Sequence, residues 1–458
     1  MNCSIWKGSQ TPENCEMLNR EELNALFSSP ALADNHSIGI AGGEPTISPF
    51  SWRLLQQIPE NRDITITTNA LKSGKLIDYL ERQSCKDRFL IQVSIDGNEE
   101  VNDQVRGVPG GYKKSVYLLE QLKRLNVRTL VSFTVNRKNF HQILDIYHLA
   151  EQFQAQFSTR MAYCGGAYDN EENRALFEFQ EDELETLEKS MIVLVNQALD
   201  QPGHHPAQLV FQDRMVSCYR DRREQRKVPC LAMETGMVVD LYGEVFPNCP
   251  VMMEKKLGNL RDKSLDEILN SIQALELKDY IRKFKCGGCW NDCQVVTNIA
   301  RCPEYLFREY NRIKMRKIQI LGNIPARIDP AEENNPFLLS GWHQPETSDT
   351  FGYCWTESDF AVPVPSGTRA IEMTVSLPEA KLGSFGTEIL FSVEGMQKVA
   401  VSVIKPGWQT ICANFKDCTV RAGVCTVSTG RAFCPGELGE SSDFRRLGMA
   451  VREIRFLG

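Results

Sequence analysis

The sequence has no apolar stretch long enough to span a bilayer, and its first residues lack the basic-then-apolar pattern of a secretion signal. It also has no surplus of positive charge, because 59 Asp and Glu residues outnumber 52 Lys and Arg residues and give a net charge of −7. A nucleic acid or an anionic membrane is therefore not expected as the main partner. These absences favour a cytoplasmic protein without a membrane span.

Low-complexity tracts and internal repeats are also absent from the sequence. Hydrophobic residues make up 42% of the chain and charged residues 24%, which are the proportions of an ordinary globular protein. With 458 residues, the chain has room for about two to four domains, each with its own core.

Cysteine, by contrast, is abundant. The chain has 16 cysteines, and six of them lie between Cys230 and Cys302. Disulfides are rare in a reducing compartment, so this uneven placement favours metal or cluster binding in that segment.

Short β-rich runs alternate with amphipathic stretches in the first part of the chain. The runs are residues 38–41, 63–68, 89–95, 129–135 and 157–162, and the clearest amphipathic stretches are 112–125 and 140–153. This alternation predicts an α/β fold with a parallel sheet, closed or partly closed, and helices outside it. Residues 171–227 are charged and helical in character and end in the charged run 221–227, which we interpret as a solvated linker face rather than a binding patch.

Several residues with binding chemistry follow the ends of these runs, where parallel sheets place their functional loops. They are Gly42, Gly43, Glu44 and Pro45, then Thr68 and Asn69, then the segment 94–97 that begins with Ser94, then Asn136. Each position could be simple turn chemistry, but their occurrence at successive strand ends favours a shared site. Two glycines after a strand would let a ligand lie directly against the backbone.

The order of these motifs resembles that of the radical S-adenosylmethionine enzymes. Cys3 lies 39 residues before Gly42, the strand-end motifs follow, and a Cys-x2-Cys-x3-Cys run begins at Cys286. The resemblance implies a partial (β/α) barrel that holds S-adenosylmethionine beside a [4Fe–4S] cluster. It also implies that a reduced cluster cleaves the cofactor to a 5′-deoxyadenosyl radical, which removes hydrogen from a substrate carbon.

The same resemblance suggests which residues contact the cofactor. The methionine amino group is expected at Gly42, Gly43 and Glu44, and its carboxylate or the ribose at Ser94. Arg106 is expected to pair with the carboxylate in a bidentate manner. For Ser94 and Arg106, a strand-end hydroxyl and a surface arginine remain equally good interpretations. The weaker candidates are Pro45, Thr68, Asn69 and Asn136.

Only Cys3 represents the three cysteines that the family uses for the first cluster, and Cys15 is too far along the chain to replace one of them. We expect that the protein extends upstream of Met1, that Cys3 is the third ligand, and that the chain as written is inactive. The alternative is a degenerate relative that has lost its cluster.

A second set of cysteines gives a stronger metal signal. Its members are Cys230, Cys249, Cys286, Cys289 and Cys293. A Cys-x2-Cys pair with Gly287 and Gly288 between its sulfurs forms a tight turn toward one metal centre. Zinc accepts the same spacing. The surroundings resemble the auxiliary-cluster extension called SPASM, or its shorter "twitch" form. The resemblance implies one auxiliary [4Fe–4S] cluster with the first four cysteines as ligands and Cys293 as a fifth candidate.

After residue 336 the pattern changes to short alternating runs, which predict an antiparallel β-sandwich. The runs are residues 361–364, 369–375, 388–393, 399–404 and 409–415. Motifs around Trp342, Trp355 and Asp443 resemble those of a sandwich appended to enzymes of bacterial surface-polysaccharide synthesis. Exposed Trp342 and Trp355 could stack on sugars or simply pack, and Arg445 and Arg446 could bind a phosphate or lie against an aspartate. The expected domains are 1–225 (barrel), 226–305 (auxiliary cluster), 306–335 (helical segment and linker) and 336–458 (sandwich).

Together these features predict a radical S-adenosylmethionine oxidoreductase or transferase. The substrate expected from the appended sandwich is a sugar, nucleotide-sugar or lipid-linked glycan, and the expected electron donor is a flavodoxin or ferredoxin. The alternatives are a peptide-modifying maturase and a non-catalytic scaffold that binds a glycan or protein. No residue stands out as a general acid or base, and Tyr163, Asp213 and Arg214 are only candidate pocket residues.

Overall fold

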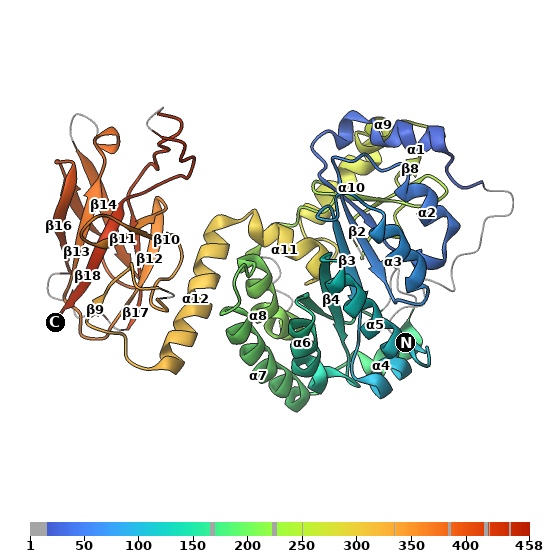
Figure 1. Ribbon diagram of the computed structural model, residues 1–458, viewed down its shortest axis with the longest axis horizontal. Helices are drawn as coiled ribbons and strands as arrows, with labels where there is room; N and C mark the ends of the chain where they lie inside the picture. The colour runs from blue at the N-terminus through green and yellow to red at the C-terminus, as the bar shows by residue number, and fades with distance from the viewer. Residues whose placement is uncertain are drawn as a thin grey trace. The chain divides into compact units, whose positions relative to one another are not determined.

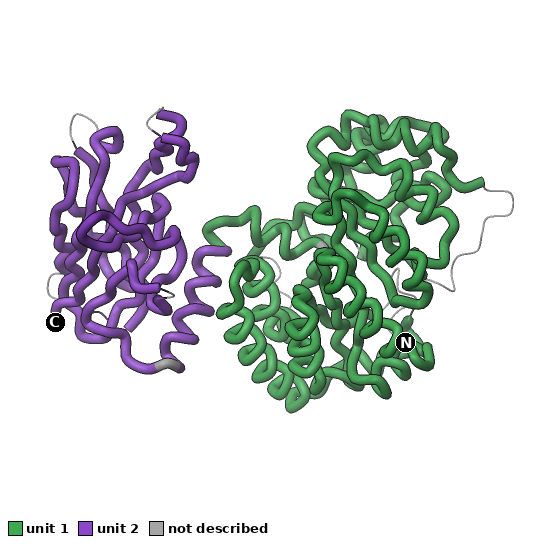
Figure 2. The backbone as a smooth tube through the Cα atoms, in the orientation of Figure 1, with its two compact units in different colours: residues 1–305 green, residues 306–458 purple. Residues whose placement is uncertain are grey.

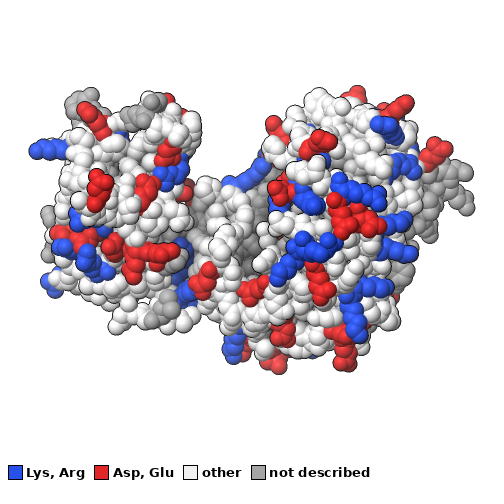
Figure 3. Space-filling model, viewed as in Figure 1, with Lys and Arg blue, Asp and Glu red and all other residues white. Residues whose placement is uncertain are grey.

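A computed structural model describes most of the chain in two compact units, Met1–Tyr305 and Leu306–Gly458 (Figure 2). The described residues are 16–164, 170–221, 227–249, 251–333, 335–382, 386–415, 420, 422–438 and 441–458, without the side chains of Cys293 and Leu321. Cys3 and Cys15 therefore lie outside them. Basic and acidic side chains are interspersed over the face in Figure 3, in keeping with the modest net charge.

The first unit contains a five-stranded parallel sheet in which the strands follow one another in chain order (Figure 1). The strands are β1 (Ser37–Ile40), β2 (Asp63–Thr68), β3 (Phe89–Ser94), β4 (Arg128–Val135) and β5 (Gln156–Met161). All five match the predicted runs to within one or two residues. The predicted α/β class with a parallel sheet is confirmed.

Helices precede, connect and follow these strands. They are α1 (Arg20–Phe27), α2 (Pro49–Leu55), α3 (Ser73–Glu81), α4 (Glu99–Arg106), α5 (Gly111–Arg124), α6 (Ile143–Gln152), α7 (Glu181–Ala198) and α8 (Pro206–Arg220). The predicted amphipathic stretches are α5 and α6, and both bury their leucine or isoleucine face. Since α5 contacts β3 and β4, and α6 contacts β4 and β5, they cover one face of the sheet.

Neighbouring residues of β5 show which elements cover the two faces, because successive side chains of a strand point in opposite directions. Phe157 packs against Tyr147 of α6, with ring centroids 5.6 Å apart. Ser158 instead bonds to Asp292 and to Gln208 of α8. We call the face that carries Ser158 the inner face of the sheet.

The helical character predicted for residues 171–227 is confirmed by α7 and α8. Most of the charged run 221–227, which we interpreted as a solvated linker face, lies outside the described residues. Eight side chains of α8 are buried, among them Val210 and Phe211, because this helix packs against β5 and α11.

The cysteine-rich segment belongs to the same compact unit as the parallel sheet. It has a three-stranded antiparallel sheet of β6 (Met237–Val239), β7 (Glu244–Pro247) and β8 (Gly258–Asn259). The helices α9 (Leu265–Leu269), α10 (Ile272–Arg282) and α11 (Asp292–Ala300) follow. Ser264 and Glu267 form a capping box that fixes the start of α9.

The second unit begins within α12 (Pro303–Leu321) and contains a β-sandwich, as predicted. One antiparallel sheet has the order β10-β11-β18-β13-β16, and the other has the order β12-β17-β14-β15. The strands are β10 (Trp342–Thr347), β11 (Gly352–Thr356), β12 (Asp359–Val364), β13 (Ala370–Leu377), β14 (Thr387–Val393), β15 (Val399–Val403), β16 (Gly407–Asn414), β17 (Gly423–Ser428) and β18 (Ala450–Leu457), while β9 (Arg327–Ile328) pairs with β18.

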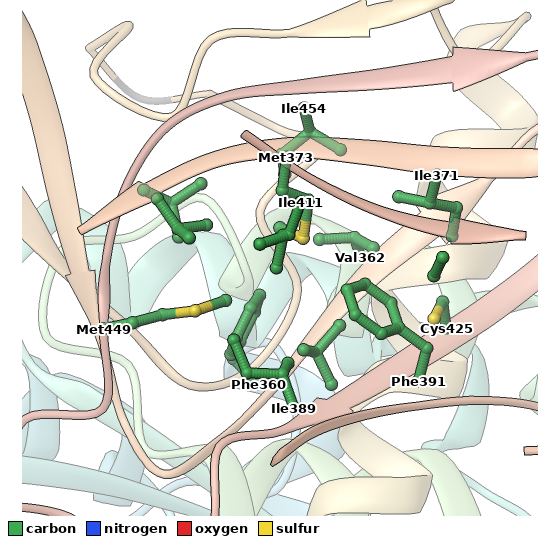
Figure 4. Packing of buried hydrophobic residues seen from close by; sticks show 14 of the residues in the cluster. Phe360, Val362, Ile371, Met373, Ile389, Phe391, Ile411, Cys425, Met449 and Ile454 are labelled. Carbon is green, nitrogen blue, oxygen red and sulfur yellow. The ribbon is translucent and has the colours of Figure 1, made fainter. Parts of the chain in front are cut away.

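The two sheets of the sandwich share one hydrophobic core (Figure 4). Phe360 and Phe391 of one sheet face Met373 and Ile411 of the other, and all four are at most 5% exposed. Such burial of aromatic and branched side chains is the main source of stability for this unit.

A series of aromatic rings lies outside this core. It comprises Phe351, Tyr353, Trp355, Trp408 and Phe433, with neighbouring ring centroids between 5.2 and 6.4 Å apart. Trp342 does not join it, because this side chain packs on Phe360 and donates to the Ala361 carbonyl at 3.0 Å. Packing is therefore the observed role of Trp342.

The described helices include none that is both long and apolar enough to cross a membrane.

Candidate functional site

The carboxylate of Glu44 ties the loop after β1 to the loop after β2. One oxygen accepts from the Thr46 amide at 3.0 Å, the Thr46 hydroxyl at 2.6 Å and the Thr68 hydroxyl at 2.7 Å, while the other accepts from the Asn69 amide at 2.6 Å. Glu44 is only 7% exposed. Both carboxylate oxygens of Glu44 thus bond within the protein, and the neighbouring backbone is the part of this loop that can bind a ligand.

That neighbouring backbone is open. Ala41, Gly42 and Gly43 are exposed, and Gly42 has a φ of 145°, which side chains rarely adopt. A Cβ added at Gly42 would meet nothing within 4 Å. This bare edge at the end of β1 fits the expected contact with the amino group of S-adenosylmethionine.

Arg106 joins the same group of residues from the end of α4. Its guanidinium donates to Asn69 Oδ1 and pairs with Asp96 at 2.9 Å. Its Nε is buried and has no hydrogen-bond partner among the described residues. Because both terminal nitrogens are already engaged, a bidentate pair with a ligand carboxylate would require Asn69 or Asp96 to move.

Three serines form a row on the inner face of the sheet. Ser94 of β3 is paired with Ser132 of β4, which is paired with Ser158 of β5, and each is at most 8% exposed. Other inner-face residues of β2 and β3, including Thr67 and Gln92, are half-buried. A parallel sheet normally buries apolar residues on both faces, so this polar and partly accessible face suits a binding cavity.

Arg160 and Asp292 close one side of this row. Arg160 donates to the Ser132 hydroxyl at 2.9 Å and pairs with Asp292 at 2.9 Å, and Ser158 donates to Asp292 at 2.8 Å. Asp292 is the first residue of α11, where a carboxylate also stabilises the helix dipole. The contact therefore joins the inner face directly to the cysteine-rich segment.

Four of the predicted metal ligands share one cavity. Cys230, Cys249, Cys286 and Cys289 line it together with apolar side chains such as Ile281 and Trp290. Burial raises the pKa of the Cys230 and Cys249 thiols, and neighbouring Cys286 adds to the effect. Metal binding needs the thiolates, so loading this site would release protons.

The predicted tight turn between the last two of these cysteines is present. Gly287 and Gly288 have φ values of 87° and 80°, in the left-handed region that favours glycine. Trp290 follows the turn and anchors it, because its indole stacks on Phe211 of α8 and donates to the Phe211 carbonyl at 2.9 Å. Its backbone amide donates to the Tyr163 hydroxyl at 2.6 Å.

The donor set fits an iron–sulfur cluster better than a single ion. Within the described part of the chain, no three His, Cys, Asp or Glu side chains are grouped tightly enough to hold one metal ion. A zinc site would bring its sulfurs within about 4 Å of one another, since Zn–S bonds are about 2.3 Å long. Four sulfurs spaced around a largely apolar cavity instead suit the wider thiolate-ligated cluster.

The remaining predicted residues are placed as follows. Asn136 lies in the turn after β4, where its side chain accepts from the Lys138 amide at 2.8 Å. Pro45 and Thr68 are buried beside Glu44. Cys293 is in α11, but its side chain is outside the described residues, and Asp213 and Arg214 lie on α8. Cys3 is not among the described residues.

Sequence reasoning missed several members of this site, among them Thr46, Ser132, Ser158, Arg160 and Asp292, and it placed Asp96 at a strand end without giving it a role. Asp292 carried a usable signal, because it lies between Cys289 and Cys293. The alignment of the three serines could not be predicted, because the sequence motifs do not give the register between neighbouring strands.

Known proteins match parts of the chain. Residues 230–294 match SPASM, an iron–sulfur cluster-binding domain. The sporulation killing factor maturation protein SkfB of Bacillus subtilis is 25% identical over 151 residues, 32% of this chain and 35% of SkfB. The mycofactocin maturase MftC of Mycobacterium ulcerans is 31% identical over 136 residues, 29% of this chain and 36% of MftC.

A solved structure, native anSMEcpe with bound AdoMet and the Cp18Cys peptide, is also similar. It has a TM-score of 0.46 and 16% identity and covers 70% of this chain and 95% of that one. Each matched segment spans only about a third of the length of SkfB or MftC. Taken with the strand-end motifs, the SPASM match and the two relatives support a radical S-adenosylmethionine protein with a SPASM domain, and this implies S-adenosylmethionine and [4Fe–4S] clusters, one of them auxiliary, as cofactors.

Proposed function

We propose that the complete protein is an enzyme that removes hydrogen from a carbon atom of a substrate held against the inner face of the parallel sheet. The observation that carries this proposal is the contact of Asp292 with Arg160 and Ser158. It places the four-cysteine cavity next to a polar, partly accessible sheet face. S-adenosylmethionine and its cluster, when bound, supply the radical chemistry.

The residues of this chain position and shield the reactants. Glu44 fixes the loop whose backbone would hold the cofactor, and Arg106 offers Nε as an unused donor. The row of serines offers hydroxyls to a polar substrate. Trp290 packs against α8 and excludes water from one side of the cysteine cavity. The auxiliary cluster in that cavity would accept an electron from the substrate, and a flavodoxin or ferredoxin would reduce the first cluster.

The substrate class that the relatives favour is a peptide. SkfB and MftC are both named for the maturation of another product, and anSMEcpe was solved with a peptide. A sugar or lipid-linked glycan is the second candidate, and the appended sandwich is the feature that favours it. A short precursor peptide encoded beside the gene would support the first candidate, and sugar-handling neighbours the second.

The cysteine cavity provides the first test. Anaerobically purified chain should contain about four irons with matching acid-labile sulfide, and an upstream-extended form about eight. Cys249→Ser and Cys286→Ser should each lose most of the iron held by the shorter chain, because each removes one thiolate of the four. Cys85→Ser is the matched control, since Cys85 is exposed and distant in sequence from the cavity residues.

Zinc in place of iron, or unchanged iron in both cavity variants, would contradict the auxiliary-cluster assignment. An extended form that gains no iron and forms no 5′-deoxyadenosine from S-adenosylmethionine under reducing conditions would contradict the proposed catalysis. The degenerate scaffold would then be the better account of the chain.

A further inference from the structure

A second cavity, of about 430 Å³, lies in the C-terminal sandwich and is separate from the cysteine site. It is lined by the 3-10 turn Glu379–Lys381, the start of β14, the residue after β17 and the segment 431–438. Its volume is within the range of small-molecule sites in proteins, about 300–1,000 Å³. The elements that form it all belong to the unit Leu306–Gly458.

Lys381 supplies a fixed positive charge at this cavity. Its ammonium donates to the Thr429 hydroxyl at 2.6 Å and to the Gly448 carbonyl at 2.6 Å. Burial lowers the pKa of Lys381 to about 8, although nearby Asp359 acts in the opposite direction. An ammonium has three donors, so one donor of Lys381 remains for a ligand, and an anion would offset the cost of its burial.

Arg431 adds a second positive charge. It is exposed at the cavity and makes no hydrogen bond or ion pair with any residue that the structure describes. Among the described residues of the lining, Glu437 is the one acidic side chain, and it is exposed as well. The lining therefore combines two cations with one carboxylate and the hydroxyl of Thr387, a set that matches an anion carrying additional hydroxyl groups.

The rest of the lining is apolar. Phe433 contributes an aromatic ring that packs edge-to-face on Trp355, with centroids 5.5 Å apart, and Ala432 and Leu438 extend this surface. The backbone pairing of Phe433 with Leu447 holds the ring in place. A simple inorganic anion would use none of this surface, whereas the C–H face of a sugar ring would pack on it.

From this combination we infer that the cavity binds an acidic saccharide, that is, a sugar unit that bears a carboxylate or a phosphate. The acidic group binds Lys381 and Arg431, the hydroxyls bind Thr387 and Glu437, and the ring packs on Phe433. The Gly448 carbonyl that holds Lys381 belongs to the segment 443–448 on which the resemblance of the sandwich rested. This inference concerns only the sandwich and does not depend on the proposed reaction.

Binding to the full chain should be measured by calorimetry or ligand-detected NMR with D-glucuronate, D-glucose 1-phosphate, D-glucose and inorganic phosphate. We expect at least one acidic sugar to bind at least tenfold more tightly than glucose and than phosphate. Arg431→Gln should weaken that binding at least tenfold. Lys398→Gln is the control, because Lys398 is an equally exposed cation of the sandwich outside the cavity. Lys381→Met should abolish binding. If that variant misfolds, Arg431→Gln still tests the inference, because Arg431 is exposed and its replacement should not disturb the fold.

Binding of glucuronate alone would assign the carboxylate form of the ligand, and binding of glucose 1-phosphate alone the phosphate form. Equal binding of glucose would overturn the inference, because the cations would then have no role. If inorganic phosphate bound as tightly as glucose 1-phosphate, the cavity would be an anion site without a saccharide preference, and the inference would be overturned. Unchanged affinity in Arg431→Gln, or displacement of the sugar by a glutamate-rich peptide that binds more tightly, would also overturn it.

Discussion

At the scale of single residues, Glu44 has a structural role in addition to its expected place beside a ligand. Its carboxylate accepts four hydrogen bonds from two loops, and none of the donors is a ligand. A change at this position should therefore disturb the binding loop before it changes any direct contact. Stability and cofactor affinity are expected to fall together.

Replacement of Glu44 by Gln tests this expectation. The amide nitrogen of Gln cannot accept, so either the Asn69 amide or the Thr46 and Thr68 donors lose their acceptor. We expect the free energy of unfolding of the first unit to fall by about 1–3 kcal/mol, and S-adenosylmethionine to bind at least tenfold more weakly. Denaturant titration and calorimetry measure the two effects. Glu60→Gln is the control at an exposed carboxylate and should change neither.

Single residues also show how far sequence reasoning reached. The sequence motifs brought Gly42, Glu44, Asn69 and Arg106 into one proposed site, and the structure brings them together. The motifs could not reveal that Arg106 pairs with Asp96. The chain has many acidic residues, and the path of the loops decides which of them Arg106 meets. The role of Glu44 as an internal acceptor was hidden for the same reason.

At the scale of elements, α11 deserves comparison with α8. Both helices pack on β5, and the first residue of α11 forms the ion pair with Arg160. The side chain of Asp292 is 10% exposed and that of Arg160 is 22% exposed, so water screens this pair only in part. This small set of contacts holds the cysteine-rich segment against the sheet.

Asp292→Asn should loosen that attachment. The substitution keeps an acceptor for Ser158 but removes the charge that Arg160 faces. We expect local opening of α11 to become easier by about 2 kcal/mol, which hydrogen exchange would record as roughly thirtyfold faster exchange in α11. Asp279→Asn serves as the control, because Asp279 forms a solvent-exposed pair with Lys283 on α10. Equal protection of α11 in both variants would show that the ion pair does not hold the helix.

The secondary elements were more predictable than their environments. The five parallel strands follow from β-rich runs of the expected length, and α5 and α6 follow from their apolar periodicity. The burial of α8 did not follow, because charged residues such as Asp213 and Arg214 lie between its apolar ones. In the sandwich, the five predicted runs match β12 to β16, whereas β10, β11, β17 and β18 were not predicted. The strands that pair with β17 and β18 lie far away in the sequence, and β14 and β13 are among them.

At the scale of the whole molecule, buried thiols should make the stability of the sandwich fall at alkaline pH. In the sandwich, burial raises the pKa of Cys425 to about 12, and burial together with nearby acidic groups does the same for Cys354. A thiol whose pKa is higher in the folded state keeps its proton while the unfolded chain loses it. The stability that it contributes is therefore complete below pH 9 and declines as the pH rises toward 12.

Cys425→Val should remove part of that decline. At this buried position of β17, a valine side chain would fill a similar space to the cysteine, but it does not titrate. Between pH 9 and pH 11, the wild type should lose about 2 kcal/mol of unfolding free energy relative to the variant. Denaturant titrations at several pH values give the difference. Cys412→Val is the control at an exposed cysteine of β16 and should leave the pH dependence as in the wild type. Parallel curves for wild type and Cys425→Val would rule the explanation out.

The aromatic series of the sandwich gives the molecule a built-in optical reporter. Rings at these separations perturb one another's electronic transitions, so Trp355 and Trp408 should give a structured near-ultraviolet circular dichroism band. Phe433 stands at one end of the series and also lines the sandwich cavity. A molecule that settles on Phe433 would shift the surroundings of Trp355, and the tryptophan emission would record its arrival without any attached label.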